Sequence, residues 1–498
     1  MPVTRIEELT IADVHDAYRR GTFTARELVQ AYLDRIDALD RSGPALNSVI
    51  SVAQDALAQA DRLDAELART GELVGPLHGV PVAVKDQIET ADIPTSFGNI
   101  LAADYLPEKD ATAIARLRDA GAIILAKTTL PDFATSWFST SSRSGITKNP
   151  YDLSRDPGGS SSGTATAVAA NLALVGIGED TGGSIRLPAS FCGLVGVRVT
   201  PGLISRAGMS SLVSPQDTSG PMTRTVADAA ALLDVMVGYD PEDSYTGAVV
   251  VDGGGSTYAD AAAEGTFAGT RLGVLRQAFP DTTDPDGAAA LEVIEKALAE
   301  LRAGGAELID IEIDRLDEQV GFTSLYTTRS QADMNTFVQA RPSLPVASMQ
   351  AIVDSGDYHE KLDLLEAIVA GPLDPTDDEE YLQRVLAQPA FQRQVLGVMA
   401  EHDLDAVVFP DAKLPAPTHA DVLGDRWTCL TYPTNTVIAS QLLFPAITVP
   451  AGHTTGDLPV GLEIMAPPYA ERPLIGIAAA VEATLGARRA PRAAVSDV

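Results

Sequence analysis

Two Gly/Ser-rich segments, joined by an apolar run of small residues, dominate the middle of this chain. The stretch 156–186 reads DPGGSSSGTATAVAANLALVGIGEDTGGSIR. Small residues let the backbone make unusual turns in both segments, and residues 164–178 between them predict a buried helix and a short strand. A solvated linker, the usual role of Gly/Ser composition, does not fit these apolar surroundings. We therefore expect the chain to leave its core twice here and to present serine hydroxyls and backbone N–H groups to a substrate.

Composition limits what such a site can be. The chain has 498 residues, of which 45% are hydrophobic and 21% charged, the balance of a globular protein with a substantial core. A formal net charge of −32 argues against a nucleic-acid surface, because phosphate contacts need clustered Lys and Arg. The two cysteines, Cys192 and Cys429, exclude a disulfide framework and a Cys-rich zinc site. Without an apolar signal core or a run of about 18 apolar residues, we expect a cytoplasmic protein with no membrane span.

The order of the expected elements favours an α/β architecture. A strand over 80–84, a helix over 110–120 and a strand over 123–126 form a strand–helix–strand unit. Further strands are expected at 49–52, 270–276, 307–313, 403–410, 446–449 and 462–465. We divide the chain into an N-terminal helical segment (1–70), a core (71–240), a variable and more helical excursion of the same domain (241–400), and a C-terminal part of the core (401–498).

Several motifs that could explain the serines fail on their context. G-x-S-x-G around Ser161 would be a nucleophile elbow only after a hydrophobic strand, and the turn-rich NPYDLSRDP precedes it. Asp180 and Asp354 begin Asp-Thr-Gly and Asp-Ser-Gly, as in aspartic proteases, but their Ala-rich surroundings are wrong for an all-β enzyme. No phosphate-binding loop and no histidine-based metal motif occurs. A Ser–His–Asp triad assembled through space stays a weaker alternative, because triads ignore sequence order.

Three separate segments, in the right order, resemble the amidase signature family. They are GVPVAVKD (79–86), PGGSSSG (157–163) and DTGGSIRLPASFCGLVGVRVTPG (180–202). Further similarity occurs in KTTLPDFA (127–134), TKNPYD (147–152) and GPMTRTVADAA (220–230). The likeness extends over roughly residues 25 to 490 and is weakest from 240 to 400. It implies a large mixed β-sheet sandwiched between helices, with the signature region at its centre.

The resemblance also implies a Ser-cisSer-Lys catalytic triad. Ser184 would be the nucleophile, Ser160 the bridging serine and Lys85 the base, with a cis peptide bond between Gly159 and Ser160. The implied activity is hydrolysis of a small carboxylic amide through a Ser184 acyl-enzyme. No cofactor and no metal is implied.

The base role makes a physical demand on Lys85. A free lysine has a pKa of about 10.4, and bringing it to roughly 7–8 requires burial. Three pKa units correspond to about 4 kcal/mol, which the surroundings of Lys85 must supply. Its place at the end of the apolar run 80–84 suits this demand. Asp86 would oppose it if it pointed inward, so we expect Asp86 to face elsewhere.

The developing oxyanion needs preorganised donors, and the second Gly/Ser segment can supply them. We expect the backbone N–H groups of Thr181, Gly182, Gly183 and Ser184 to form an oxyanion hole, in which losing one donor costs roughly 10²–10³ in rate. Arg186 reads as a salt-bridge residue that could also brace this loop.

Substrate identity is the part that the sequence determines least. Trp137 and Phe138 are candidate lining residues of a pocket for an aryl or hydrophobic amide, against the alternative that they are ordinary core aromatics. The family also contains glutaminase subunits of tRNA-dependent amidotransferases, and the same apparatus would serve a carbamate, hydrazide or ester hydrolase. We expect a small-molecule amide as the partner, with neither nucleic acid nor membrane, and we consider a homodimer.

Overall fold

The centre of the molecule is a mixed sheet of eleven strands in a computed structural model that describes residues 6–252 and 256–492. The strands are β1 (Val49–Val52), β2 (Pro81–Lys85), β3 (Ile123–Thr128), β4 (Val175–Asp180), β5 (Val195–Arg198), β6 (Thr218–Thr223), β7 (Arg271–Leu275), β8 (Glu307–Ile311), β9 (Ala406–Pro410), β10 (Ala446–His453) and β11 (Pro459–Met465). Their order across the sheet is β1-β3-β2-β4-β6-β5-β10-β11-β9-β7-β8. Strands β3, β2 and β4 run parallel to one another, and β6 runs antiparallel to β4.

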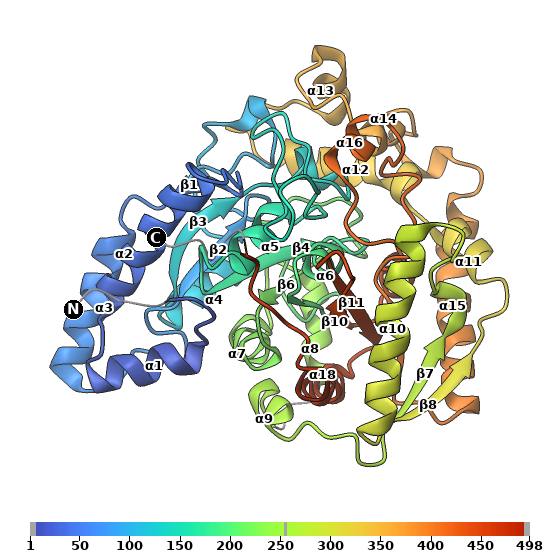
Figure 1. The fold of residues 1–498 in the computed structure, drawn as a ribbon. Coiled ribbons are helices and arrows are strands. Elements are labelled where there is room, and N and C mark those ends of the chain that lie inside the picture. The colour runs from blue at the N-terminus through green and yellow to red at the C-terminus, as the bar shows by residue number, and fades with distance from the viewer. Residues whose placement is uncertain (1–5, 253–255, 493–498) are drawn as a thin grey trace.

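Helices cover both faces of this sheet (Figure 1). They are α1 (Ile11–Arg20), α2 (Ala25–Arg35), α3 (Ala56–Thr70), α4 (Thr112–Asp119), α5 (Ser162–Ala169), α6 (Arg186–Phe191), α7 (Val226–Met236), α8 (Val249–Asp252), α9 (Tyr258–Ala263), α10 (Pro285–Ala303), α11 (Leu316–Thr323), α12 (Tyr326–Gln339), α13 (Met349–Ser355), α14 (Asp363–Val369), α15 (Tyr381–Glu401), α16 (His419–Leu423), α17 (Val437–Gln441) and α18 (Glu471–Leu485). Single 3-10 or π-helical turns lie at Ile36–Asp40, Ile100–Ala102, Asp132–Ala134, Ser244–Ala248, Arg276–Ala278 and Pro375–Asp377.

Side-chain alternation along the strands divides the core into layers. In β9, Ala406 and Val408 join the large core beneath α7, α10 and α18, whereas Val407 and Phe409 pack with α15 and α17 on the other side. Helices α5 and α6 also pack on that second side, against β4 and β5. The large mixed sheet between helices, which the family resemblance implied, is therefore confirmed.

Strand β4 shows how the sequence brings the Gly/Ser segments onto the sheet. Its Val175 and Ile177 enter the large core, while Gly176 and Gly178 face α5 and the loop before it. A Cβ at Gly178 would lie 2.8 Å from Ser161 Oγ, so only glycine permits this approach. The alternation of large and absent side chains in VGIGED thus seats the first Gly/Ser segment directly on the strand that leads into the second.

Strand β6, which lies beside β4, and its next neighbour β5 were not predicted from the sequence. From Val197 the sequence predicts loops that lead into a helix starting near Thr225 or Val226, yet TSGPMT forms β6 and pairs with both β4 and β5. Gly and Pro are depleted in strand interiors, so tertiary pairing overrides the local preference here. Strand β5, VGVR, is likewise absent from the expected elements. The excursion 241–400 also contributes to the sheet, since β7 and β8 form its far edge.

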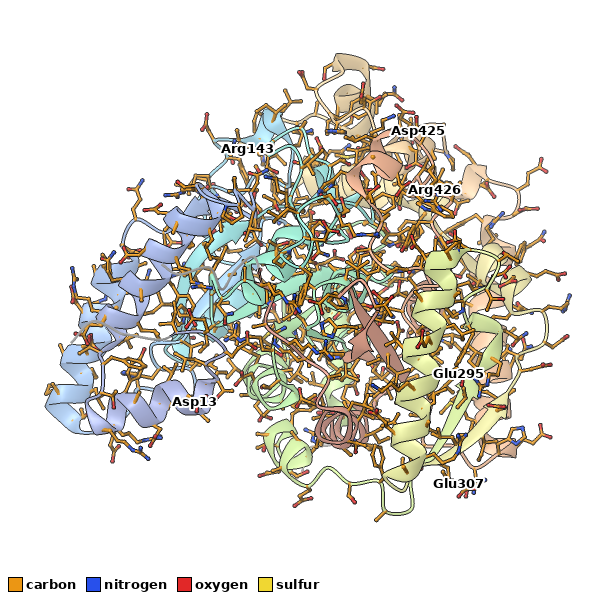
Figure 2. All side chains as sticks on the ribbon, viewed as in Figure 1. Asp13, Arg143, Glu295, Glu307, Asp425 and Arg426 are labelled. Carbon is orange, nitrogen blue, oxygen red and sulfur yellow. The ribbon has the colours of Figure 1, made fainter. Side chains whose placement is uncertain are left out.

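The acidic residues lie mainly outside this core. Figure 2 shows Asp13, Glu307 and Asp425 at the periphery of the molecule, and all three are exposed. Within the described residues, no helix is long and apolar enough to span a bilayer.

Candidate active site

Lys85 ends β2 and is completely buried. Its Nζ lies 2.7 Å from Ser160 Oγ, 3.1 Å from Glu179 Oε2 and 3.2 Å from the Glu179 carbonyl oxygen. Strands β2 and β4 are parallel neighbours, with Val84 opposite Ile177, so their carboxyl ends meet at one edge of the sheet. This topology places the lysine from β2 against the glutamate from β4.

The two serines come from adjacent turns. Ser160 precedes α5, and the Gly159–Ser160 peptide bond is cis, as the family resemblance implied. The Ser161 N–H donates to the carbonyl oxygen of Ser184 over 3.0 Å, which fixes the two Gly/Ser segments against each other. Ser184 is 3% exposed and precedes α6 by two positions. Lys85, Ser160 and Ser184 thus occupy one buried region at the carboxyl ends of β2 and β4.

A buried ionic network holds the second segment, whose tip is formed by residues 181–184. The Arg186 guanidinium donates to both carboxylate oxygens of Asp180 and to Glu463, and Arg198 Nη1 donates to Asp180 Oδ1 over 3.0 Å. These cations hold the pKa of Asp180 well below its usual range despite its burial. Arg186 therefore braces the loop from inside the protein.

The same network already engages one of the four N–H groups expected to form the oxyanion hole. The Gly183 N–H donates to Asp180 Oδ1 over 2.9 Å. The carboxylate also binds the Ile185 N–H, over 3.1 Å. Thr181, Gly182 and Ser184 remain the candidate donors of this loop.

Burial dominates the electrostatics of Lys85. Desolvation lowers the pKa of Lys85, while Glu179, Asp180 and Asp217 oppose that change. Asp86 faces elsewhere, as expected, because its carboxylate lies 3.0 Å from Lys127 Nζ. Burial raises the pKa of Glu179 to about 7, against the pull of Lys85.

Two side chains from distant segments cover the glycines of the loop. A Cβ at Gly182 would overlap the Tyr326 hydroxyl at the start of α12, and a Cβ at Gly183 would overlap the Thr436 hydroxyl. Thr436 Oγ1 also donates to the Gly182 carbonyl oxygen over 2.8 Å. The sequence offered no signal for either residue, because both lie far along the chain from the signature segments.

Glu179 is a third residue that sequence reasoning did not identify. Its signal was present, since a glutamate at the end of a buried strand is unusual and Lys85 ends another buried strand. Only the pairing of β2 with β4, which the sequence does not show, brings the two together.

The backbone atoms of Trp137 and Phe138 lie next to the first Gly/Ser segment. A Cβ at Gly159 would lie 2.9 Å from Trp137 C and from Phe138 O. The Phe138 ring is buried with Leu187, Phe191 and Tyr432, whereas Trp137 is half-buried. The Phe138 ring thus packs in a buried cluster, and the pocket roles of Trp137 and Phe138 both stay predictions.

The histidine nearest to these motifs serves packing. His78 is buried at the entrance of β2, where its Nδ1 accepts from the Val74 N–H over 3.0 Å. In the described part of the chain, no group of three or more His, Cys, Asp or Glu side chains is placed to hold a metal ion.

Comparisons with known proteins agree on the family of this chain. The family model described as Amidase matches residues 27–475. A glutamyl-tRNA(Gln) amidotransferase subunit of Alkaliphilus metalliredigens is 32% identical, over 97% of each chain. The peptide amidase structure from Stenotrophomonas maltophilia is 34% identical, with a TM-score of 0.86, and covers 98% of this chain and 99% of that one.

The structure of a glutamyl-tRNA(Gln) amidotransferase subunit from Thermotoga maritima superposes less closely. It has a TM-score of 0.75 at 26% identity and covers 99% of each chain. The family match spans most of this chain, including both Gly/Ser segments and the residues of the buried Lys–Ser contact. The chain belongs to the amidase signature family and is an enzyme of the carbon–nitrogen hydrolase type.

Proposed function

We propose that this protein hydrolyses a small carboxylic amide through an acyl-enzyme on Ser184. The observation that carries the proposal is the 2.7 Å contact between Lys85 Nζ and Ser160 Oγ in a fully buried setting. A lysine removed from solvent is a competent base, since burial disfavours its charged form.

The proposed reaction passes one proton along three side chains. Ser184 Oγ attacks the amide carbonyl and loses its proton to Ser160, whose own proton moves to the Lys85 amine. When the tetrahedral intermediate collapses, the proton returns through Ser160 to the leaving nitrogen and the C–N bond breaks. Water then attacks the Ser184 ester by the same relay, releasing the acid and restoring the serine.

The oxyanion would form against the second Gly/Ser segment. The backbone N–H groups of Thr181, Gly182 and Ser184 are the proposed donors, and the Asp180–Arg186 network keeps that loop in place before substrate arrives. Fixed dipoles of this kind stabilise the transition state because they need no reorganisation.

The cover over the loop favours a neutral or hydrophobic amide. Tyr326 belongs to an apolar cluster that includes Phe97, Phe133 and Phe337, and Trp137 packs against this cluster. Arg329, one turn along α12 from Tyr326, is engaged by Asp333 over 2.7 Å. We therefore propose an aryl or other hydrophobic acyl group next to the scissile amide, with peptide amides as a related class because a peptide amidase is among the similar structures.

A second candidate is the glutaminase subunit of a tRNA-dependent amidotransferase. Similarity to curated subunits named for that complex favours it, at 32% and 34% identity for two of them. Such a subunit would release ammonia from glutamine and depend on partner subunits. Carbamate, hydrazide and ester hydrolysis would use the same relay and form a third candidate.

A substrate panel with matched variants tests the proposal. The purified protein alone should hydrolyse hydrophobic amides or peptide amides in preference to glutamine, and Ser184→Ala should abolish that activity with the fold intact. Ser162→Ala is the control, because it removes a neighbouring buried hydroxyl that has no hydrogen-bond partner in the described structure. Activity in Ser184→Ala would remove the nucleophile assignment. Glutaminase activity that appears only with partner proteins would favour the second candidate.

A further inference from the structure

The Thr181 hydroxyl lies between two buried carboxyl groups. Its Oγ1 is 2.9 Å from Glu179 Oε1 and 2.6 Å from Asp217 Oδ1. A hydroxyl carries a single hydrogen and can donate to only one of these oxygens. Two ionised carboxylates would leave the other contact as a lone-pair repulsion inside the protein, which is costly at low dielectric. One of the two carboxyl groups must therefore carry a proton for both contacts to be hydrogen bonds.

Asp217 has the surroundings of an ionised acceptor. Its Oδ1 accepts from the Val213 N–H over 3.0 Å, and its Oδ2 accepts from the Leu212 N–H and the Ser211 hydroxyl, both over 2.9 Å. Backbone N–H groups directed at both oxygens favour the charged form. Thr181 therefore donates its hydroxyl hydrogen to Asp217. The hydrogen in the contact between Thr181 and Glu179 then comes from the carboxyl group of Glu179.

We propose that Glu179 is held as a neutral carboxylic acid that donates its proton to Thr181 Oγ1, and that it thereby acts as a positioning residue that keeps Lys85 in its amine form. This inference rests on the proposed role of Lys85 as the base. An ionised glutamate 3.1 Å away would stabilise the ammonium form and work against that role. A neutral acid accepts a hydrogen bond from Lys85 through Oε2 without adding a full negative charge.

The charges around Glu179 support the neutral form. Lys85 from β2 is the basic group in contact with it, and two acidic residues, Asp217 and the neighbouring Asp180, lie nearby. Asp180 is already neutralised by two arginines, and burial keeps Tyr326 in its neutral phenol form by raising its pKa. The raised pKa of Glu179, about 7, agrees with a carboxyl that gives up its proton reluctantly.

The hydrogen bonds of Lys85 fit the same proton arrangement. A neutral amine has two N–H donors and one lone pair, and its three contacts are two Glu179 oxygens and the Ser160 hydroxyl. The two N–H groups donate to Glu179 O and Oε2, and the lone pair accepts from Ser160. During acylation the amine gains the Ser160 proton while Glu179 keeps its own, and the proton later leaves with the nitrogen of the substrate.

Glu179→Gln is the decisive variant, because glutamine reproduces the donor and acceptor of a neutral acid. The amide NH₂ can donate to Thr181 and the amide oxygen can accept from Lys85. We expect kcat/KM within about threefold of the native value and an acidic limb of the pH–rate profile that stays in place. If Glu179 is ionised instead, glutamine removes an anion and moves that limb down by more than about one pH unit, which overturns the inference.

Glu179→Leu is the matched variant that loses both hydrogen bonds. Leaving Thr181 and Lys85 without this partner should lower kcat by about 10- to 100-fold. Equal activity of the leucine and native proteins would show that the residue does not position the base. Circular dichroism of each variant confirms that the comparison is between folded proteins.

Infrared spectroscopy tests the protonation without any assay of activity. The native-minus-Glu179→Gln difference spectrum at neutral pH should contain the C=O band of a protonated carboxylic acid, and the same band should appear on a Ser184→Ala background. A carboxylate band instead overturns the inference and leaves the proposed function standing. Activity in Ser184→Ala together with the acid band would overturn the proposed function and leave the protonation of Glu179 intact.

Discussion

Replacing Asp180 by asparagine removes a negative charge that two buried guanidinium groups share. Asp180 Oδ1 accepts from Gly183 N at 2.9 Å and from Arg186 Nη2 and Arg198 Nη1 at 3.0 Å each. Its Oδ2 accepts from Ile185 N at 3.1 Å and from Arg186 Nε at 3.2 Å. Asparagine offers one acceptor oxygen for these donors and turns an N–H₂ group toward the others.

The size of the stability loss depends on which hydrogen-bond partners the two arginines retain. Removing one partner of a buried ion pair costs about 3–5 kcal/mol. Arg186 retains Glu463, and Arg198 retains the carbonyl oxygens of Asp180 and Gln216, so the lower end applies. We expect Asp180→Asn to lose about 3 kcal/mol of unfolding free energy at pH 7, measured by urea denaturation followed by circular dichroism.

The direction in which this stability difference changes with pH can also be predicted. The folded-state pKa of Asp180 is depressed, so its stabilisation is present above the unfolded value of about 3.9 and disappears as pH falls through the folded pKa. The gap between native and Asp180→Asn proteins should therefore be full at pH 7 and close only in strong acid. Asp37→Asn, which removes an exposed surface pair with Arg41, is the control and should change stability by less than about 0.5 kcal/mol. A loss below about 1 kcal/mol in Asp180→Asn would refute the reasoning.

Three further predictions concern the site and the pH response. Gly183→Ala should reduce kcat by at least about 10²-fold, since φ is +124° and the new Cβ overlaps Thr436; native kinetics would contradict this expectation. Tyr326→Phe should change KM across an amide panel by up to about tenfold with unaltered stability, and an unchanged KM would exclude contact with substrate. Burial lowers the pKa of His15 to about 4, so the unfolded chain binds this proton first and stability falls between pH 6.5 and 4. His15→Gln should flatten that fall in thermal melts, and an identical slope would show that His15 does not contribute.

The sequence predicted the elements whose pattern is local. The capping-box pattern of Thr24 and Glu27 is readable in the sequence and begins α2, and β2 and β3 appear where apolar β-prone runs suggested them. It failed on β6, because Gly220 and Pro221 are poor strand residues whose conformation is set by pairing with β4 and β5. Local secondary-structure propensity is a poor guide for a strand that is hydrogen-bonded to a neighbouring strand on each side.

The same distinction between local and tertiary information applies to the residues of the candidate site. Lys85, Ser160 and Ser184 could be singled out as candidates because they lie in short segments that resemble a known family, and the structure brings those segments together. Glu179 and Tyr326 could not, since their relation to the site depends on strand pairing and on the path of α12. The engagement of Gly183 by Asp180 also required coordinates, because a loop sequence does not show which N–H groups turn inward.

The site has a floor and a roof of different origin. The floor is a set of strand ends and a loop clamped by buried ions, whereas the roof is α12 and the Thr436 turn, carried by segments that the chain adds around its central sheet. Exchanging the roof would leave the residues of the proposed proton relay untouched. If the proposed mechanism holds, evolution or an engineer can select new amides by rebuilding Tyr326 and its neighbours while the proposed catalytic residues are inherited unchanged.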